Sequence, residues 1–148
     1  MKRILGGVAL SLLMTVASAQ SDYVQVAKVK RSFADVKENL VSAIENQGLV
    51  INTTSQVGVM LERTGQDVGS SRRIYQDAEI IEFCSAKTSR AVMEADPQAI
   101  TLCPYSISIY TLPGQTEMVY VAYRKFPSTP SLKPAANLVA AIVKEAIK

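Results

Sequence analysis

The stretch AEIIEFCSAKTSRAVMEADPQAITLCPYSISIY, residues 78–110, predicts a strand, a helix and a second strand in succession. Residues 78–83 are mostly apolar or aromatic with two glutamates, a composition that suits a half-buried strand. Ser85 stands at the N-cap position of a helix over residues 86–95. An Asp-Pro pair ends this helix, because the residue before a proline avoids helical geometry. Residues 100–112 then alternate as the second strand.

Both cysteines of the chain lie in this stretch, Cys84 at the end of the first strand and Cys103 near the start of the second. A thiol beside a helix N-terminus feels the helix dipole, which favours a thiolate, so we expect Cys84 to be the more acidic and accessible of two redox candidates. The usual Cys-x-x-Cys spacing is missing. The alternatives are two inert thiols or a structural disulfide, which would close a loop of ~20 residues and contribute ~3 kcal/mol. Parallel strands would place the two Cα atoms beyond the ~7 Å that a bridge tolerates.

Strand and helix signals alternate along the rest of the chain. Ser32 and Asp35 resemble a capping box, and Gly48 suits the C-terminal cap of the helix that they begin. Residues 55–63 fit either a helix or a loop. The other predicted segments are strands at 23–30, 49–53 and 117–126, a helix at 33–47, a mobile polar loop at 64–73, a turn at 112–115, a Pro-rich linker at 127–134 and a last helix at 135–148. This order predicts an α+β fold, with a largely antiparallel sheet and helices packed on one side.

The first 19 residues have the form of a cleaved secretory signal peptide. Lys2 and Arg3 precede an apolar run at 4–16, and the segment Ala17-Ser18-Ala19 provides the small residues of a cleavage site. The apolar run is shorter than the ~20 residues that a spanning helix needs. We therefore expect a mature chain that begins at Gln20, resides in the periplasm or outside the cell, and is not stably inserted in a membrane.

Composition limits the function of the mature chain. Removing the signal leaves 14 basic against 13 acidic residues, a net charge of +1 in place of +3, which gives no indication of a nucleic-acid partner. Residues 20–126 fit a single domain, on which the helix at 135–148 is expected to dock. The chain contains no histidine, which excludes Ser-His and Cys-His dyads and Cys₂His₂ zinc sites. We expect no cofactor, and the composition favours a binding protein over an enzyme.

Two further sets of residues are candidates for a site. The thiolates of Cys84 and Cys103, with Met60, Met93 or Met118, would suit Cu(I), although methionines at such apolar positions more often fill a core. Aromatic rings near guanidinium groups are able to line a cleft for a small anionic or aromatic ligand, although such tyrosines are more often half-buried strand residues. The candidates for this cleft are Ser85, Arg90, Tyr105, Tyr120, Tyr123 and Arg124, with Tyr110 and Lys125 beside them.

Several short blocks of the chain carry a family resemblance. These blocks are Glu82-Phe83-Cys84-Ser85-Ala86, Ser89-Arg90, Met93-Glu94-Ala95-Asp96-Pro97 and Cys103-Pro104-Tyr105, followed by the strand at 119–125. In them the chain resembles the family catalogued as domain of unknown function 302. The resemblance implies a small α+β domain and no agreed activity.

These observations favour one function and leave a second open. The first is an exported single-domain module that binds an unknown small ligand or a partner protein and performs no chemistry of its own. The alternative is a thiol-based redox protein or a Cu(I)-handling protein that uses Cys84 and Cys103.

Overall fold

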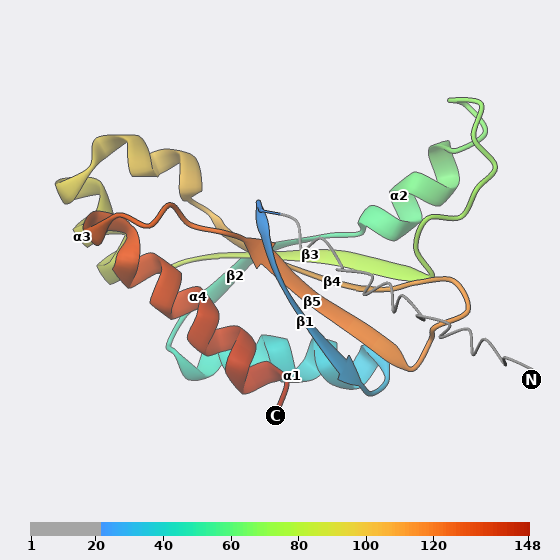
Figure 1. Cartoon of the computed structure of the whole chain (residues 1–148), viewed down its shortest axis with the longest axis horizontal. Coiled ribbons are helices and arrows are strands. Elements are labelled where there is room, and N and C mark those ends of the chain that lie inside the picture. Colours follow the sequence, from blue (N-terminus) through green and yellow to red (C-terminus); the bar gives the residue numbers. More distant parts are fainter. Residues whose placement is uncertain (1–21) are drawn as a thin grey trace, which may run out of the picture.

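The computed structural model describes residues 22–148, which form a five-stranded antiparallel sheet and its covering helices (Figure 1). The strands lie in the order β1-β5-β4-β3-β2. In chain order the elements are β1 (Val24–Lys30), α1 (Phe33–Asn46), β2 (Val50–Ser55), α2 (Val57–Thr64), β3 (Asp77–Cys84), α3 (Ala86–Ala95), the 3₁₀ helix η1 (Pro97–Leu102), β4 (Tyr105–Thr111), β5 (Met118–Arg124), the 3₁₀ helix η2 (Pro130–Leu132) and α4 (Lys133–Ala146). The predicted α+β class, antiparallel sheet and element order are confirmed.

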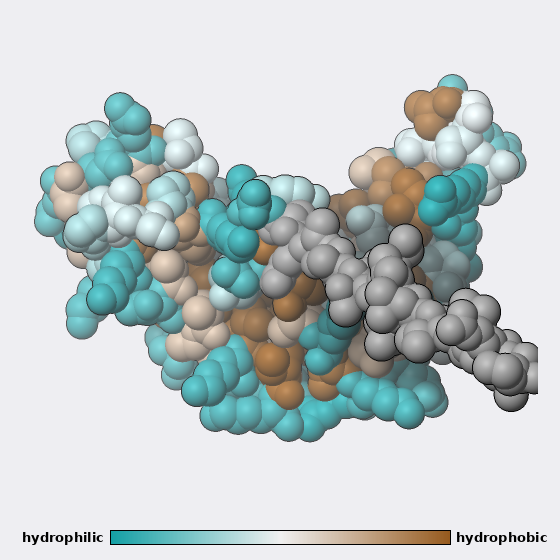
Figure 2. Space-filling view, viewed as in Figure 1, coloured by the Kyte–Doolittle hydropathy of each residue, from teal (hydrophilic) through white to brown (hydrophobic). Residues whose placement is uncertain are grey.

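One face of the sheet is covered by α1 and α4, which lie against each other beneath it (Figure 1). Side chains of a strand alternate between the two faces, so every second residue of β4 is buried here. In α1 the buried residues Val36, Leu40 and Ile44 recur at intervals of four and form the stripe that packs on the sheet. Truncating a fully buried leucine such as Leu40 to alanine typically costs about 2–5 kcal/mol. Hydrophilic residues follow the outer side of α1, which faces solvent (Figure 2).

The opposite face of the sheet carries no helix across its middle. Figure 1 shows α2 and the α3–η1 segment at opposite ends of the sheet, both on the side away from α1. Helix α2 has no buried residue, and its place beside β3 depends on Gly58. A Cβ atom at Gly58 would lie 2.9 Å from the backbone nitrogen of Ala78. The sheet therefore has an open face bounded at both ends, and we call it the open face.

Local signals set the element ends in three places. The Ser32 hydroxyl accepts a hydrogen bond from the Asp35 backbone N–H at 3.1 Å, which begins α1 as predicted. Gly48, with φ +70°, follows that helix. Gly114, with φ +78°, makes the predicted turn between β4 and β5.

Two of the boundaries that differ from the sequence-based expectation have a local cause. The strand predicted at 100–112 begins only at Tyr105, because Asp96 caps Gln98 and starts η1, whose first residue is a proline. The last helix begins at Lys133 rather than at residue 135. Pro134 is tolerated in its first turn, where no N–H group is needed, so η2 and the helix start take up much of the expected linker.

None of the helices within residues 22–148 combines the length and apolar composition that crossing a membrane requires. The predicted signal peptide at 1–19 lies outside the described residues.

Candidate functional site

Strand register aligns the side chains of the open face in rows that run across the sheet. Paired residues of neighbouring strands point to the same face, so each row takes one residue from each of β3, β4, β5 and β1. Three such rows matter for the site: Ala78, Tyr110, Tyr120 and Lys28; then Ile80, Ser108, Ala122 and Val26; then Glu82, Ser106, Arg124 and Val24. In the third row, Ser106 and Arg124 are joined by a side-chain hydrogen bond, beyond the paired part of β4 and β5. The middle row contains the smallest side chains.

The first row forms a wall of aromatic rings. Tyr110 and Tyr120 stack with ring centroids 4.9 Å apart and planes only 6° from parallel. Tyr75, from the segment before β3, meets Tyr110 edge-on at 5.3 Å, and the Lys28 ammonium lies 5.2 Å from the Tyr120 centroid. Burial raises the pKa of Tyr110, and the neighbouring hydroxyls of Tyr75 and Tyr120 add to this shift. The Tyr110 hydroxyl therefore remains neutral at physiological pH.

The middle row is the floor of a trough beside this wall. Ser108 and Ala122 are too short to fill the space above them, and Ile80 and Val26 continue the floor to either side. Two adjoining hollows, of about 340 and 320 Å³, occupy the open face here and share Tyr23 in their lining. Each is large enough for a small ligand, since ligand pockets typically measure ~300–1,000 Å³. We refer to these hollows together as the trough.

The third row brings opposite charges to the far side of the trough. The Arg124 guanidinium donates a hydrogen bond to the Ser106 hydroxyl at 3.3 Å, and Glu82 pairs with Ser106 from the other side. Within residues 22–148, neither Arg124 nor Glu82 takes part in an ion pair. Both charges are therefore free to meet a ligand.

The two cysteines lie together at the α3 end of the sheet. Their Sγ atoms are 3.1 Å apart, and both thiols are free and half-buried. Because β3 and β4 are antiparallel, with Phe83 opposite Tyr105, Cys84 and Cys103 belong to the same end of the sheet. The two cysteines are therefore not held apart, as they would be if the two strands were parallel.

Hydroxyl groups surround this thiol pair. The Ser89 hydroxyl lies 3.7 Å from Cys103 Sγ and donates to the Tyr105 hydroxyl at 3.5 Å. Ser85, as predicted, caps α3 by accepting a hydrogen bond from the Thr88 N–H at 3.2 Å. This cap places Ser89 one turn into the helix, beside Cys103.

The predicted acidity of Cys84 is wrong. Burial first, then the hydrogen bond with Cys103 and the charges of Cys103 and Glu82, raise the pKa of Cys84 to about 11. The helix dipole does not compensate, because Cys84 precedes the N-cap residue and lies outside the first turn of α3. Cys84 is therefore a neutral thiol at physiological pH.

Comparison with known families identifies the chain. A family model described as "Domain of unknown function DUF302" matches residues 25–148. The chain belongs to the DUF302 family. The match confirms the family resemblance and extends through α4.

Solved structures agree with this fold. The crystal structure of the uncharacterized conserved protein DUF302 from Bacillus stearothermophilus is similar, with a TM-score of 0.64 at 15% identity. The similarity covers 86% of this chain and 97% of that one. No curated protein matches the chain. The comparisons therefore show the family and the fold of this DUF302 domain.

The structure separates the residues predicted for a binding cleft. Tyr120 and Arg124 lie on the open face, on opposite sides of the trough. Tyr105 alternates to the covered face and is buried there. Tyr123 also packs against the core, but it contributes to the lining of the 320 Å³ hollow as well. Ser85 is the α3 cap described above, and exposed Arg90 pairs with Glu94 at 3.0 Å on the surface of α3.

Sequence reasoning missed the trough itself. Ser108 and Ala122 form its floor because they are small and directly paired, and Tyr75 joins the wall from outside the strands. The alternation of β4 and β5 would have shown that Ser108 and Ala122 share a face with Tyr110 and Tyr120, given the correct register.

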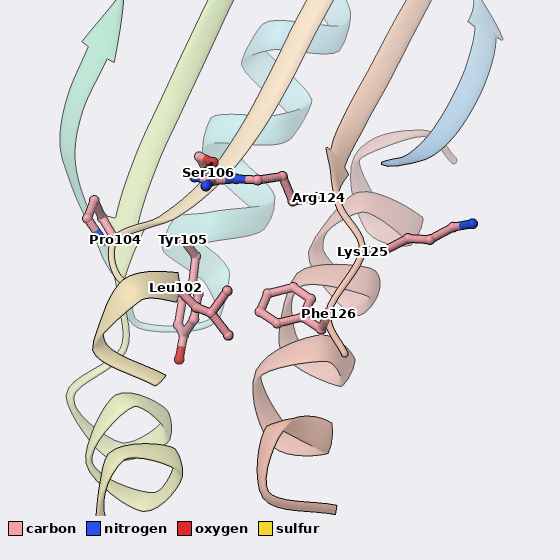
Figure 3. A pocket seen from close by; sticks show the side chains of 7 residues that line it. All are labelled: Leu102, Pro104, Tyr105, Ser106, Arg124, Lys125 and Phe126. Carbon is pink, nitrogen blue, oxygen red and sulfur yellow. Dashed lines mark hydrogen bonds between the residues drawn. The ribbon is translucent and has the colours of Figure 1, made fainter. Parts of the chain in front are cut away.

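A separate crevice lies where β4 and β5 reach the α3 end (Figure 3). Leu102, Tyr105 and Phe126 converge on it, while Arg124 extends toward Ser106. Its volume of about 20 Å³ holds roughly one water molecule. Lys125 belongs to the lining of the crevice, but its side chain points away from it (Figure 3).

The methionines predicted as metal ligands do not gather around the thiols. Met60 belongs to α2 and Met118 to the start of β5, both at the opposite end of the sheet from Cys84 (Figure 1). Met93 packs against the core. Residues 22–148 contain no group of three or more His, Cys, Asp or Glu side chains arranged to hold a metal ion.

Proposed function

We propose that this DUF302 domain binds a small ligand in the trough of its open face. The observation that carries the proposal is the combination of an unfilled hollow, a wall of stacked tyrosines and an Arg124 guanidinium without a carboxylate partner among the described residues. Tyrosine rings offer apolar contact at low entropic cost, and a guanidinium recognises carboxylates in a two-pronged geometry. The proposed ligand therefore combines an apolar body with an anionic group.

A titration followed by amide NMR spectra tests this binding. Benzoate and S-methylcysteine serve as probes, and we expect shifts that concentrate at Ser108, Ala122 and Arg124. Arg124→Gln should weaken binding roughly ten- to hundredfold, since a charge-assisted hydrogen bond contributes about 1.5–3 kcal/mol. Lys125→Gln is the matched control, because it removes the neighbouring charge that points away from the site. Ser108→Phe should fill the trough and abolish the shifts.

The result that would contradict the proposal is equally specific. Shifts confined to other surfaces, or equal affinity in the wild type, Arg124→Gln and Ser108→Phe proteins, would show that the trough is not the binding site. Thermal melts of each variant establish that the fold is retained.

We also propose that the domain acts after export, in the periplasm or outside the cell. The support is the basic, apolar and small-residue succession of the first 19 residues. Intact-mass analysis of the exported protein should find Gln20 as the first residue. Recovery of the uncleaved chain from the cytosol would contradict export.

A second candidate function is thiol chemistry at Cys84 and Cys103, as a disulfide, a redox pair or a Cu(I) site. The 3.1 Å distance between the sulfur atoms favours it, because a small movement would bring them to the ~2.05 Å of a bond. Chelator competition with Cu(I) separates the metal from the redox form. Uptake of one Cu(I) that is lost in Cys84→Ser supports the metal form, and no uptake by the reduced protein leaves the redox form.

A further inference from the structure

Strand alternation places Cys84 on the same face of the sheet as the trough, and Cys103 lies just before β4 with its Sγ 3.1 Å from that of Cys84. Cys84 follows Glu82 by two residues on β3, so alternation directs both side chains to the open face, about 7 Å apart along the strand. The charge of Glu82 acts on the Cys84 thiol, which agrees with this proximity. The third row of the trough therefore separates the tyrosine wall from the sulfur atoms.

That third row offers two opposite charges on either side of Ser106. Arg124 reaches Ser106 from β5, and Glu82 is its partner on β3. A guanidinium binds a carboxylate and a carboxylate binds an ammonium, so the two together fit the zwitterionic end of an amino acid. Ser106 and Cys84 are diagonal neighbours on adjacent strands, a separation of about 7–8 Å, which leaves room for a short side chain.

We infer that the trough and the thiol pair form one site, and that its ligand is a small disulfide with an amino-acid end group. The site reduces this disulfide by thiol–disulfide exchange, or oxidises the matching thiols in the reverse direction. This inference rests on ligand binding in the trough and adds both the ligand class and the reaction.

Cys103 is the attacking sulfur. Its Sγ lies 3.1 Å from the Cys84 thiol, which is able to donate a hydrogen bond to a negative charge there, and 3.7 Å from the Ser89 hydroxyl, which does so once its proton turns away from Tyr105. Cys103 gives its proton to solvent and attacks one sulfur of the ligand. The ligand S–S bond breaks, the leaving thiolate takes up a proton, and a mixed disulfide with Cys103 remains.

Cys84 is the resolving sulfur. It loses its proton and attacks Cys103 Sγ, which releases the second ligand thiol after protonation and forms the Cys84–Cys103 disulfide. In sum, one ligand disulfide and two protein thiols become two ligand thiols and one protein disulfide, with two electrons passing to the ligand. The raised pKa of Cys84 keeps this thiol protonated in the reduced pair, where it is able to donate a hydrogen bond to Cys103 Sγ.

Rates of oxidation of the reduced protein test the inference. The probes are cystine, which carries the zwitterionic end groups, and hydroxyethyl disulfide, which is neutral. Arg124→Gln should slow the reaction with cystine about tenfold and leave the reaction with hydroxyethyl disulfide within about twofold. Lys125→Gln should leave both rates within about twofold of the wild type. Equal slowing with both probes, or no slowing with either, would overturn the assignment of one shared site.

Mass spectrometry tests the roles of the two sulfurs. Cys84→Ser should accumulate a mixed disulfide that carries one half-cystine, whereas Cys103→Ser should accumulate none. The reverse result would overturn the roles assigned to the two cysteines. Exchange that is absent in the wild-type protein would overturn the reaction.

A double variant distinguishes thiol–disulfide exchange from ligand binding in the trough. The Cys84→Ser/Cys103→Ser protein has no thiol, so titration with S-methylcysteine reports the trough alone. Shifts at Ser108 and Arg124 without exchange in the wild type would preserve trough binding and refute the reaction. If the wild-type protein shows no preference for cystine and the double variant shows no shifts with S-methylcysteine, both trough binding and the shared site are refuted.

Discussion

Lys37 of α1 reaches through the covered layer to Glu79 of β3, with its ammonium 2.7 Å from Oε2 and 2.9 Å from Oε1. The Glu79 side chain is only 11% exposed, whereas that of Lys37 is 37% exposed. The Lys37 ammonium therefore compensates the negative charge of the Glu79 carboxylate, which lies under α1 with little access to water.

We expect Lys37→Met to destabilise the domain by about 1–3 kcal/mol, because it leaves a buried carboxylate without a counter-charge. Exposure of Lys37 to solvent keeps this value below the 3–5 kcal/mol typical of fully buried pairs. The double variant Lys37→Met/Glu79→Leu should recover most of the loss. Urea unfolding measures both, and a double variant less stable than Lys37→Met would show that the pair is not the cause.

Gly58→Ala should destabilise the domain although alanine is the better helix former. The propensity gain is about 1 kcal/mol, but the new Cβ would lie 2.9 Å from the Ala78 backbone nitrogen, which cannot move without disturbing β3. We expect a net loss of about 1–2 kcal/mol in urea unfolding, with amide NMR shifts at Ala78. A more stable variant would mean that α2 adjusts its position freely.

Alkylation of Cys84 should have a pH midpoint near 11 instead of the ordinary 9.0, because burial and Cys103 raise the pKa of this thiol. A group whose pKa is higher in the folded state contributes stability at low pH and loses it as pH rises. The contribution of the Cys84 thiol to the free energy of unfolding is therefore complete below about pH 9 and disappears by about pH 11. In Cys103→Ala the midpoint should fall. Iodoacetamide labelling across this range measures it, and a midpoint at or below 9.0 in the wild type would contradict the assignment.

Trypsin should cut the native domain first after Arg72. The neighbouring Arg73 is held by hydrogen bonds to the backbone oxygens of Tyr75 and Gln76 and by Glu62. Arg72 is exposed, and none of the side-chain hydrogen bonds or ion pairs described within residues 22–148 involves it. Arg73→Ala should speed cleavage after Arg72, since it loosens the segment. Earlier cleavage in the helices α1 or α4 would contradict this order of local stability.

Sequence alone predicted the elements that depend on neighbouring residues. The alternation from Tyr105 onward indicated a strand with one buried face, and Ser32 and Ser85 marked two helix starts through short contacts with their own helices. These signals are local, because a helix cap or a hydrophobic period involves only residues a few positions apart in the chain. The short blocks around Cys84 and Cys103 were sufficient to indicate the family.

Only the tertiary structure decided how these elements meet. The antiparallel pairing of Phe83 with Tyr105 brings the two cysteines within 3.1 Å, whereas a parallel pairing of the same strands would have separated them. The pairing of Ser108 with Ala122 likewise makes the trough, and a slip of one residue would have turned these side chains to the covered face. Register and strand direction are set by hydrogen bonds and core packing between segments distant in the chain. No local pattern specifies them, and the site follows from them.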